Sequence, residues 1–209
     1  MAEGTTRIEA FSDGVFSIAS TLLILEIRIP HAGVDGGLWA SLVALWPSYF
    51  AFALSFFVIL VTWITHHDLM RLVRETTHFV LLANGCALLY VTFIPFPTAV
   101  LAANLGGPDT STAVALYCGT FVFGSAAFNL LVAAIARGQL CRPEVDAQAI
   151  DRVRRGFRMT FVIYLVATGI AFVAPYVALA INIAVRVHLL RIRYRLAPSL
   201  PTTLGELTP

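Results

Sequence analysis

The chain has 209 residues, of which 58% are hydrophobic and only 12% charged, whereas an ordinary soluble domain carries about 25% charged residues. Its 12 acidic and 14 basic residues leave a net charge of +2, too small and too dispersed for a nucleic-acid-binding surface. All the basic residues are arginine, which excludes enzymes that need a Schiff-base or phosphate-loop lysine. The composition predicts a protein whose main partner is the lipid bilayer, with no nucleic acid partner.

Six stretches of the chain are long and apolar enough to be membrane spans. A helix that crosses the ~30 Å hydrocarbon core needs about 20 mostly apolar residues. The stretches predict an all-α membrane protein with six transmembrane helices in one unit over residues 1–200, followed by a short cytoplasmic tail over residues 201–209. Residues 1 to about 10 and residues 197–209 are expected to be mobile. The stretches run from about Phe11 to Ile29, Trp39 to Ile64, Phe79 to Ala103, Thr112 to Ala136, Phe157 to Val173 and Pro175 to Leu190.

The first stretch carries an apolar stripe with an acidic residue on another face. At about 100° per residue, Asp13 lies about 140° from Ile18 in a helix. If the stripe faces a pore, Asp13 points into protein and anchors neighbouring helices by hydrogen bonding. The alternative is that the stripe meets lipid while the Asp13 face meets the bundle, and periodicity leaves both open. The stripe consists of Phe11, Ile18, Leu22 and Leu25, with Thr21 at its edge.

A few other polar residues and prolines interrupt the apolar stretches. Pro47 in the second stretch, and Pro95 and Pro97 in the third, are expected to bend their helices. The neighbouring His66 and His67 point about 100° apart on a helix and cannot readily ligate one metal together. No resident metal or cofactor is therefore expected. The remaining polar positions are Trp63 at the end of the second stretch and Asn84, Asn129 and Asn182 within later ones.

Arginines gather in alternate connections between the stretches. Six lie from Arg137 to Arg158, whereas the connections over residues 31–37 and 106–111 contain none. The positive-inside rule therefore predicts a multi-pass protein of the cell membrane with both termini in the cytoplasm. Because the arginines are expected at the ends of spans, no span resembles a voltage sensor. The same side is marked by Arg7, Arg71, Arg74, Arg191, Arg193 and Arg195.

One motif and three local matches resemble a known family. The run from Arg7 to Asp13 is similar to the RxxxFSD signature of the endosomal and lysosomal potassium channel family, transmembrane protein 175 and its bacterial relatives. Beyond about residue 105 only the pattern of spans is similar. The matching positions are Arg7, Phe11, Ser12 and Asp13, the segment 21–30, Trp63 with His66 or His67, and Asn84 with the segment 93–98.

This resemblance implies a potassium-selective cation channel assembled as a homotetramer, with the first helix of each chain lining a central pore. It implies that Ile18 forms the constriction, that Thr21 contributes to selectivity, and that Leu22 and Leu25 continue the hydrophobic narrowing. The permeant potassium ion is then the only ligand expected, with no fixed metal. The helix-packing network implied by the resemblance comprises Arg7, Phe11, Ser12, Asp13, Trp63, His66, His67 and Asn84.

The sequence lacks a TVGYG-like segment whose carbonyls could replace the hydration shell of an ion. Under the channel interpretation, the gate and selectivity element is then a hydrophobic constriction, and we expect moderate selectivity for potassium. A proton-coupled carrier in which Asp13 and His66 exchange protons, and a non-conducting membrane scaffold, are the alternatives. No enzyme activity is expected.

Overall fold

The computed structural model describes residues 3–28, 37–143 and 147–196, and nearly all of this part of the chain is helical. Residues 197–209, which include the predicted cytoplasmic tail over 201–209, lie outside the described residues. The elements are α1 (Glu3–Leu22), the 3₁₀ helix η1 (Leu23–Glu26), α2 (Gly37–Ala44), α3 (Trp46–Arg71), α4 (His78–Phe93), α5 (Pro95–Asn104), α6 (Thr110–Arg137), α7 (Ala147–Ala171) and α8 (Pro175–Leu196).

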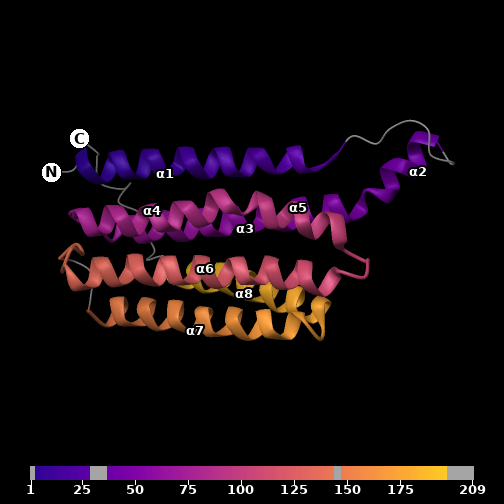
Figure 1. Cartoon of the computed structure of the whole chain (residues 1–209). Helices are drawn as coiled ribbons and strands as arrows, with labels where there is room; N and C mark the ends of the chain where they lie inside the picture. Colours follow the sequence, from indigo (N-terminus) through magenta and orange to yellow (C-terminus); the bar gives the residue numbers. More distant parts are fainter. Residues whose placement is uncertain (1–2, 29–36, 144–146, 197–209) are drawn as a thin grey trace, which may run out of the picture.

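The long helices pack side by side in layers (Figure 1). α1 lies on one side against α3 and α4, and α6 lies in the middle against α4, α5, α7 and α8. α7 lies on the opposite side of the bundle, mainly against α6 and to a lesser extent against α8. The two outermost helices, α1 and α7, therefore face away from each other.

Prolines divide two of the predicted stretches. The prediction of one span from Trp39 to Ile64 is wrong, because α2 ends at Ala44 and a separate helix, α3, starts at Trp46 and runs to Arg71. Pro47 lies in the first turn of α3, where its missing amide proton costs no helical hydrogen bond. The third stretch is interrupted at Ile94, since Pro95 and Pro97 cannot donate to the preceding turn.

Two predicted helix starts are also wrong. α1 begins at Glu3, so most of the N-terminal segment expected to be mobile is helical. α7 begins at Ala147, ten residues before the predicted Phe157, and its first turns contain four arginines. An amphipathic helix can bury one side while its charged side chains remain in water, so charge alone did not mark the end of the helix.

Four helical segments of the described chain are long and apolar enough to cross a membrane, namely Thr5–Glu26, Trp46–Arg71, His78–Asn104 and Thr110–Arg137. The apolar part of α8, Pro175–Leu190, is shorter, and α7 is not among these four. The protein is thus a multi-pass membrane protein, and six crossings remain a prediction.

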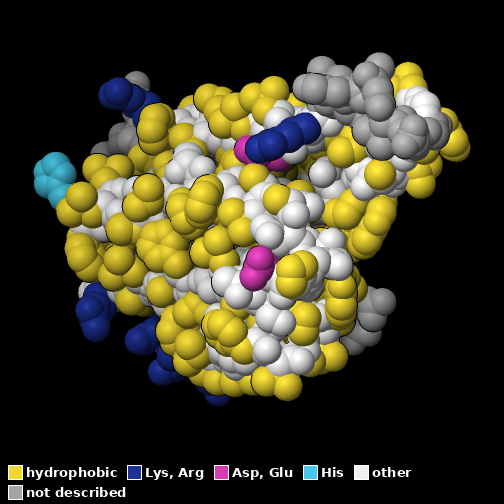
Figure 2. Space-filling model, turned by 45° about the vertical axis from the view of Figure 1, so that its right-hand side comes forward, with side chains coloured by type: hydrophobic (Ala, Val, Ile, Leu, Met, Phe, Trp, Pro, Cys, Tyr) yellow, Lys and Arg dark blue, Asp and Glu magenta, His cyan; other side chains and the backbone are white. Residues whose placement is uncertain are grey.

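The arginine-rich connections lie at one end of the bundle. The start of α1 and the described parts of the α3–α4 and α6–α7 connections share that end, and the α5–α6 and α7–α8 connections lie at the other (Figure 1). Two backbone hydrogen bonds join the arginine-rich connections, from Arg74 N to Leu140 O (2.8 Å) and from Arg142 N to Leu72 O (2.9 Å). Figure 2 shows most of the dark blue side chains along the left-hand rim, and a mainly hydrophobic surface between the ends.

Candidate functional site: the two faces of α1

One face of α1 is fixed to the bundle by a buried polar network. The side-chain amide of Asn84, on α4, donates from Nδ2 to Ser12 Oγ on α1 at 3.1 Å. Its Oδ1 atom lies 2.7 Å from Nε2 of His66 on α3. An amide oxygen only accepts hydrogen bonds, so Nε2 of His66 is the donor in this contact. All three side chains are buried, and the network joins three helices.

The acidic residue of the motif has a separate partner. Trp63 Nε1 donates a hydrogen bond of 2.8 Å to Asp13 Oδ1, which links α3 to α1. One turn later on α3, the ring of His67 stacks on Trp63 with centroids 5.9 Å apart. His66 instead lies between Phe16 and Phe128, at centroid distances of 5.5 Å and 6.4 Å. The two neighbouring histidines therefore serve different contacts.

Two residues of the motif lie away from this network. Arg7 and Phe11 are both exposed, with Phe11 67% accessible. Arg7 forms no hydrogen bond or ion pair with the residues that the structure describes. Within one chain the motif thus divides into Ser12 and Asp13, which hold α1 to the bundle, and Arg7 and Phe11, which face outward.

The stripe predicted from periodicity lies on the uncovered face of α1. Ile18 is 61% exposed, Leu22 44% and Leu25 72%, whereas Phe16, Ala19 and Leu23 are buried. Leu25 lies in η1, where the tighter 3₁₀ winding of about 120° per residue still leaves it on the outside.

One exposed residue beside the stripe carries a hydroxyl group. Thr21 Oγ1 donates to the carbonyl oxygen of Ile18 at 2.9 Å. This bond uses the hydroxyl proton on the backbone one turn earlier, so the oxygen lone pairs face outward. Beside the large apolar groups, the exposed face of α1 therefore carries the hydroxyl oxygen of Thr21 as an acceptor.

A buried arginine in α8 contradicts the expectation that arginines lie at the ends of helices. Arg186 is only 7% exposed. It donates from Nη1 to Thr62 Oγ1 on α3 (2.9 Å) and from Nη2 to Tyr90 Oη on α4 (3.2 Å). Its guanidinium carbon lies 5.1 Å from the ring centroid of Phe121 on α6 and 5.4 Å from that of Tyr164 on α7.

One side chain of α8 thus contacts four other helices. The sequence held a signal for it, because Arg186 falls inside the last predicted stretch, where an ionisable group needs buried partners.

No group of three or more potential metal ligands occurs among the described residues. The long apolar helices and the uncovered face of α1 define a multi-pass membrane protein of the helical-bundle class.

The sequence profile described as "Endosomal/lysosomal potassium channel TMEM175" matches residues 7–95.

Curated relatives extend the similarity over most of the chain. A potassium channel of Chamaesiphon minutus is 41% identical over 88% of this chain and 92% of its own length. A potassium channel of Streptomyces collinus is 42% identical over 83% of this chain and 85% of its own length. The human endosomal/lysosomal proton channel TMEM175 is 35% identical over 59% of this chain, which corresponds to 26% of that protein. The chain belongs to the TMEM175 family, which is a family of ion channels rather than enzymes.

A solved structure agrees with this assignment. The crystal structure of a lysosomal potassium-selective channel TMEM175 homolog from Chamaesiphon minutus is similar to this chain with a TM-score of 0.83 and 38% sequence identity. The match covers 91% of this chain and 98% of the other. The resemblance first seen in the RxxxFSD run is confirmed.

Proposed function

We propose that four copies of this chain form a potassium-selective channel in the cell membrane, with both termini in the cytoplasm. Each copy would cross the membrane six times, through α1, α3, α4 continued by α5, α6, α7 and α8. The observation that carries the proposal is the uncovered stripe of α1, which the chain's own helices leave exposed although the opposite face is closely packed. Four such stripes brought together around one axis would form the wall of a pore. The names of the bacterial relatives support potassium as the permeant ion.

The proposed gate is a ring of four Ile18 side chains. Large apolar groups close to the axis expel water, so the pore is closed when they meet and conducts when they part. An ion passing the ring loses part of its hydration shell, and potassium, which holds water less strongly than sodium does, loses less free energy. Thr21 lies one turn further along and supplies a hydroxyl oxygen, and Leu22 and Leu25 continue the narrow section toward the other end.

The polar network has a positioning role in this proposal. Ser12 lies about 120° from Ile18 around the helix axis, so its bond to Asn84 sets the rotation of α1. The Asp13 to Trp63 bond provides a second attachment point at the same level. Rotation of α1 by one residue would replace Ile18 by a neighbour at the axis. Arg7 and Phe11 have no partners of this kind among the residues that the structure describes, and we expect them to contact the adjacent chains.

Purified protein in liposomes tests the proposed function. With a potassium gradient we expect passive potassium flux that does not require a proton gradient, and a smaller flux when sodium replaces potassium. A proton-gradient arm is needed because the human relative is named a proton channel. Flux that occurs only with stoichiometric proton exchange would identify a carrier, and absence of flux in every arm would identify a scaffold. Either result would refute the proposal.

A further inference from the structure

A groove of about 560 Å³ lies between α6 and α7, on the far side of the bundle from α1. Its α6 wall includes the small residues Ala126 and Ala133, and its α7 wall includes Arg154, Arg158 and Phe161. α7 packs mainly against α6 and less against α8, and it is an outermost helix of the bundle. In a tetramer built around α1, α7 would lie on the side of each chain away from the central axis, where lipid surrounds the protein.

The groove changes from basic to apolar along its length. Arg154 and Arg158 are four residues apart and so lie on one side of α7, nearer the arginine-rich end of the bundle. Phe161 and Val162 follow about one turn closer to the middle of the helix. At 1.5 Å per residue, Arg158 lies about 20 Å from the far end of α7 at Ala171. With a hydrocarbon core of ~30 Å, both guanidinium groups can reach the headgroup level by extending along the helix.

The two arginines keep most of their hydrogen-bond donors available. Arg154 Nη1 lies 3.7 Å from Asp151 Oδ1, in a contact whose two side chains are 42% and 67% exposed. Exposed pairs of this kind contribute little. Arg158 is exposed and has no hydrogen bond or ion pair with a described residue. From residue 137 to residue 158 the sequence has six arginines and three acidic residues, so the surroundings attract anions.

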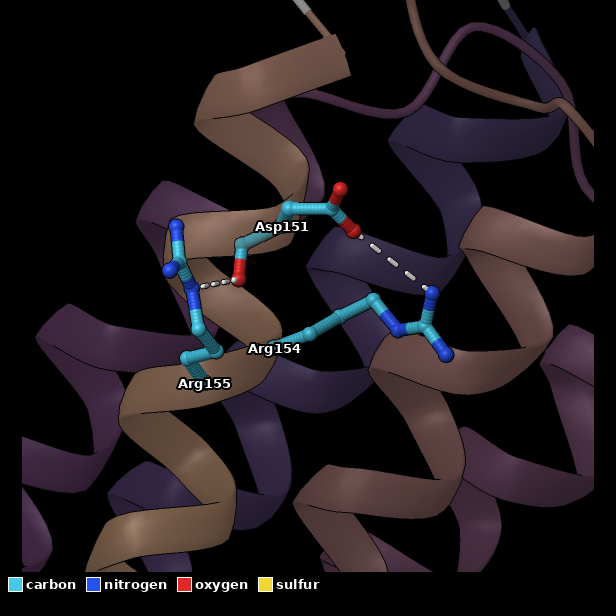
Figure 3. Close-up of polar contacts among 3 residues, drawn as sticks. All are labelled: Asp151, Arg154 and Arg155. Atoms are coloured by element: carbon cyan, nitrogen blue, oxygen red, sulfur yellow. Dashed lines mark hydrogen bonds and ion pairs between the residues drawn. The ribbon is translucent and has the colours of Figure 1, made fainter.

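Arg155 provides an internal comparison. Its side chain leaves α7 on the other side of Asp151 from Arg154, as Figure 3 shows, and its Nε donates to the backbone oxygen of Asp151 at 3.4 Å. Arg155 is not part of the groove wall, although it is adjacent in sequence. Replacing Arg155 removes one positive charge from α7, as replacing Arg154 does, but leaves the groove wall unchanged.

The walls of the groove are held in place. Asn129, which also lines it, donates from Nδ2 to the carbonyl oxygens of Phe157 (3.0 Å) and Ser125 (2.8 Å). The rings of Phe128 and Phe157 stack with centroids 5.8 Å apart. A site fixed before binding loses less conformational entropy when a ligand occupies it.

We propose that this groove binds one anionic phospholipid from the leaflet at the arginine-rich end. Its phosphodiester lies between Arg154 and Arg158, whose guanidinium groups suit phosphate oxygens. One acyl chain follows Phe161 and Val162 across the small side chain of Ala126. The inference rests on the membrane arrangement within the proposed function, and not on the identity of the permeant ion.

Lipid binding to the purified full-length protein in a nonionic detergent tests the inference. Native mass spectrometry counts bound phosphatidylglycerol, with phosphatidylcholine and inorganic phosphate as parallel arms. We expect phosphatidylglycerol to bind best to the unaltered protein. The double variant Arg154→Gln, Arg158→Gln should weaken its binding at least fivefold. The control Arg152→Gln, Arg155→Gln removes two charges from exposed arginines of α7 that do not line the groove, and it should retain binding.

A second variant keeps every charge and fills the groove. Ala133→Phe should also lower phosphatidylglycerol binding, which makes the test independent of any folding defect in the arginine variant. Equal weakening by the two double variants, equal binding of phosphatidylcholine, or full competition by inorganic phosphate would each overturn the proposal. Potassium flux is not a readout here, so a failure of this inference is distinguishable from a failure of the proposed function.

Discussion

α1 and α6 are both long apolar helices, but their surroundings in one chain are opposite. Within the most apolar part of each span, 22% of α1 is buried, compared with 61% of α6. α6 contacts four neighbouring helices, whereas α1 uses one face against α3 and α4. Most of the apolar side chains of α6 are thus buried by contacts within the chain. Those on the outer face of α1 need a partner outside the chain, either lipid or other copies.

The two regions also use polar groups differently. On the packed face of α1, hydrogen bonds among Ser12, Asn84 and His66 hold this helix at a set rotation. Around α6 and α8, the charged Arg186 is enclosed by hydroxyl groups and aromatic rings from four helices. The first arrangement orients a surface helix, and the second joins the interior of the bundle. Substitutions in α1 should therefore alter conduction and assembly, and those around α6 should alter stability.

The largest effect on conduction is expected from a substitution on the uncovered face of α1. Ile18→Asn should let water fill the constriction, raise potassium flux about tenfold and reduce the preference over sodium. A tenfold rise corresponds to a barrier lower by roughly 1.4 kcal/mol. Flux assays in liposomes measure both quantities. Val166→Asn is the control, since it places the same polar group on the 55% exposed Val166 of α7 and should leave flux unchanged. Unaltered flux and selectivity in the Ile18 variant would exclude Ile18 as the gate.

The attachment of α1 to the bundle should depend on Asp13. Asp13→Ala removes the acceptor of the Trp63 bond and should cost about 1–3 kcal/mol, seen as a lower melting temperature and poor tetramer assembly on size-exclusion chromatography. Asp13→Asn keeps an oxygen acceptor at this position and should assemble nearly normally. A normal tetramer from the alanine variant would show that Asp13 is not an anchor.

The stability of the protein should be sensitive to added side-chain volume around α6, whereas conduction should not depend on this packing directly. A Cβ atom at Gly124 would lie 2.5 Å from the ring of Tyr90, so Gly124→Ala should lower stability by about 1–3 kcal/mol through overpacking. Thermal unfolding in detergent measures this loss. Gly119→Ala is the matched control, because its nearest neighbour, Thr168 Cγ2, would lie at 3.8 Å. Equal melting temperatures for the two variants would contradict the close contact of α6 with α4.

The smallest effect is expected at Arg186. Tyr90→Phe removes one hydrogen-bond acceptor of the guanidinium group and should cost about 0.6 kcal/mol, the average for such bonds within membranes. Tyr164→Phe provides the comparison, since the hydroxyl group of Tyr164 is buried without a hydrogen-bond partner in the described chain. Its removal should leave the melting temperature unchanged or higher. A greater loss for Tyr164→Phe than for Tyr90→Phe would contradict the described contacts.

Sequence reasoning was most successful where hydrophobicity and a compact motif carried the signal. The membrane class and the family were predicted from composition and from the run of Arg7 to Asp13, and both are confirmed. The start of α3 could not be predicted, because Trp39 to Ile64 is apolar on both sides of Pro47 and proline is compatible with a first turn. The early start of α7 was hidden by arginines that occupy the exposed side of the helix. Ile18, Thr21, Leu22 and Leu25 remain predicted pore residues.

The sequence alone determined that this protein is a bundle of apolar helices with its arginines mainly in alternate connections, since those properties depend on composition and on order along the chain. Only the tertiary structure separated His66 from His67, joined Ser12 to Asn84, and enclosed Arg186 among four helices. Residues far apart in sequence meet in these contacts, and an amino-acid sequence by itself contains no measure of the distance between helices. The packing of α1 against α3 and α4 then decides which side of that helix is left to contact something else.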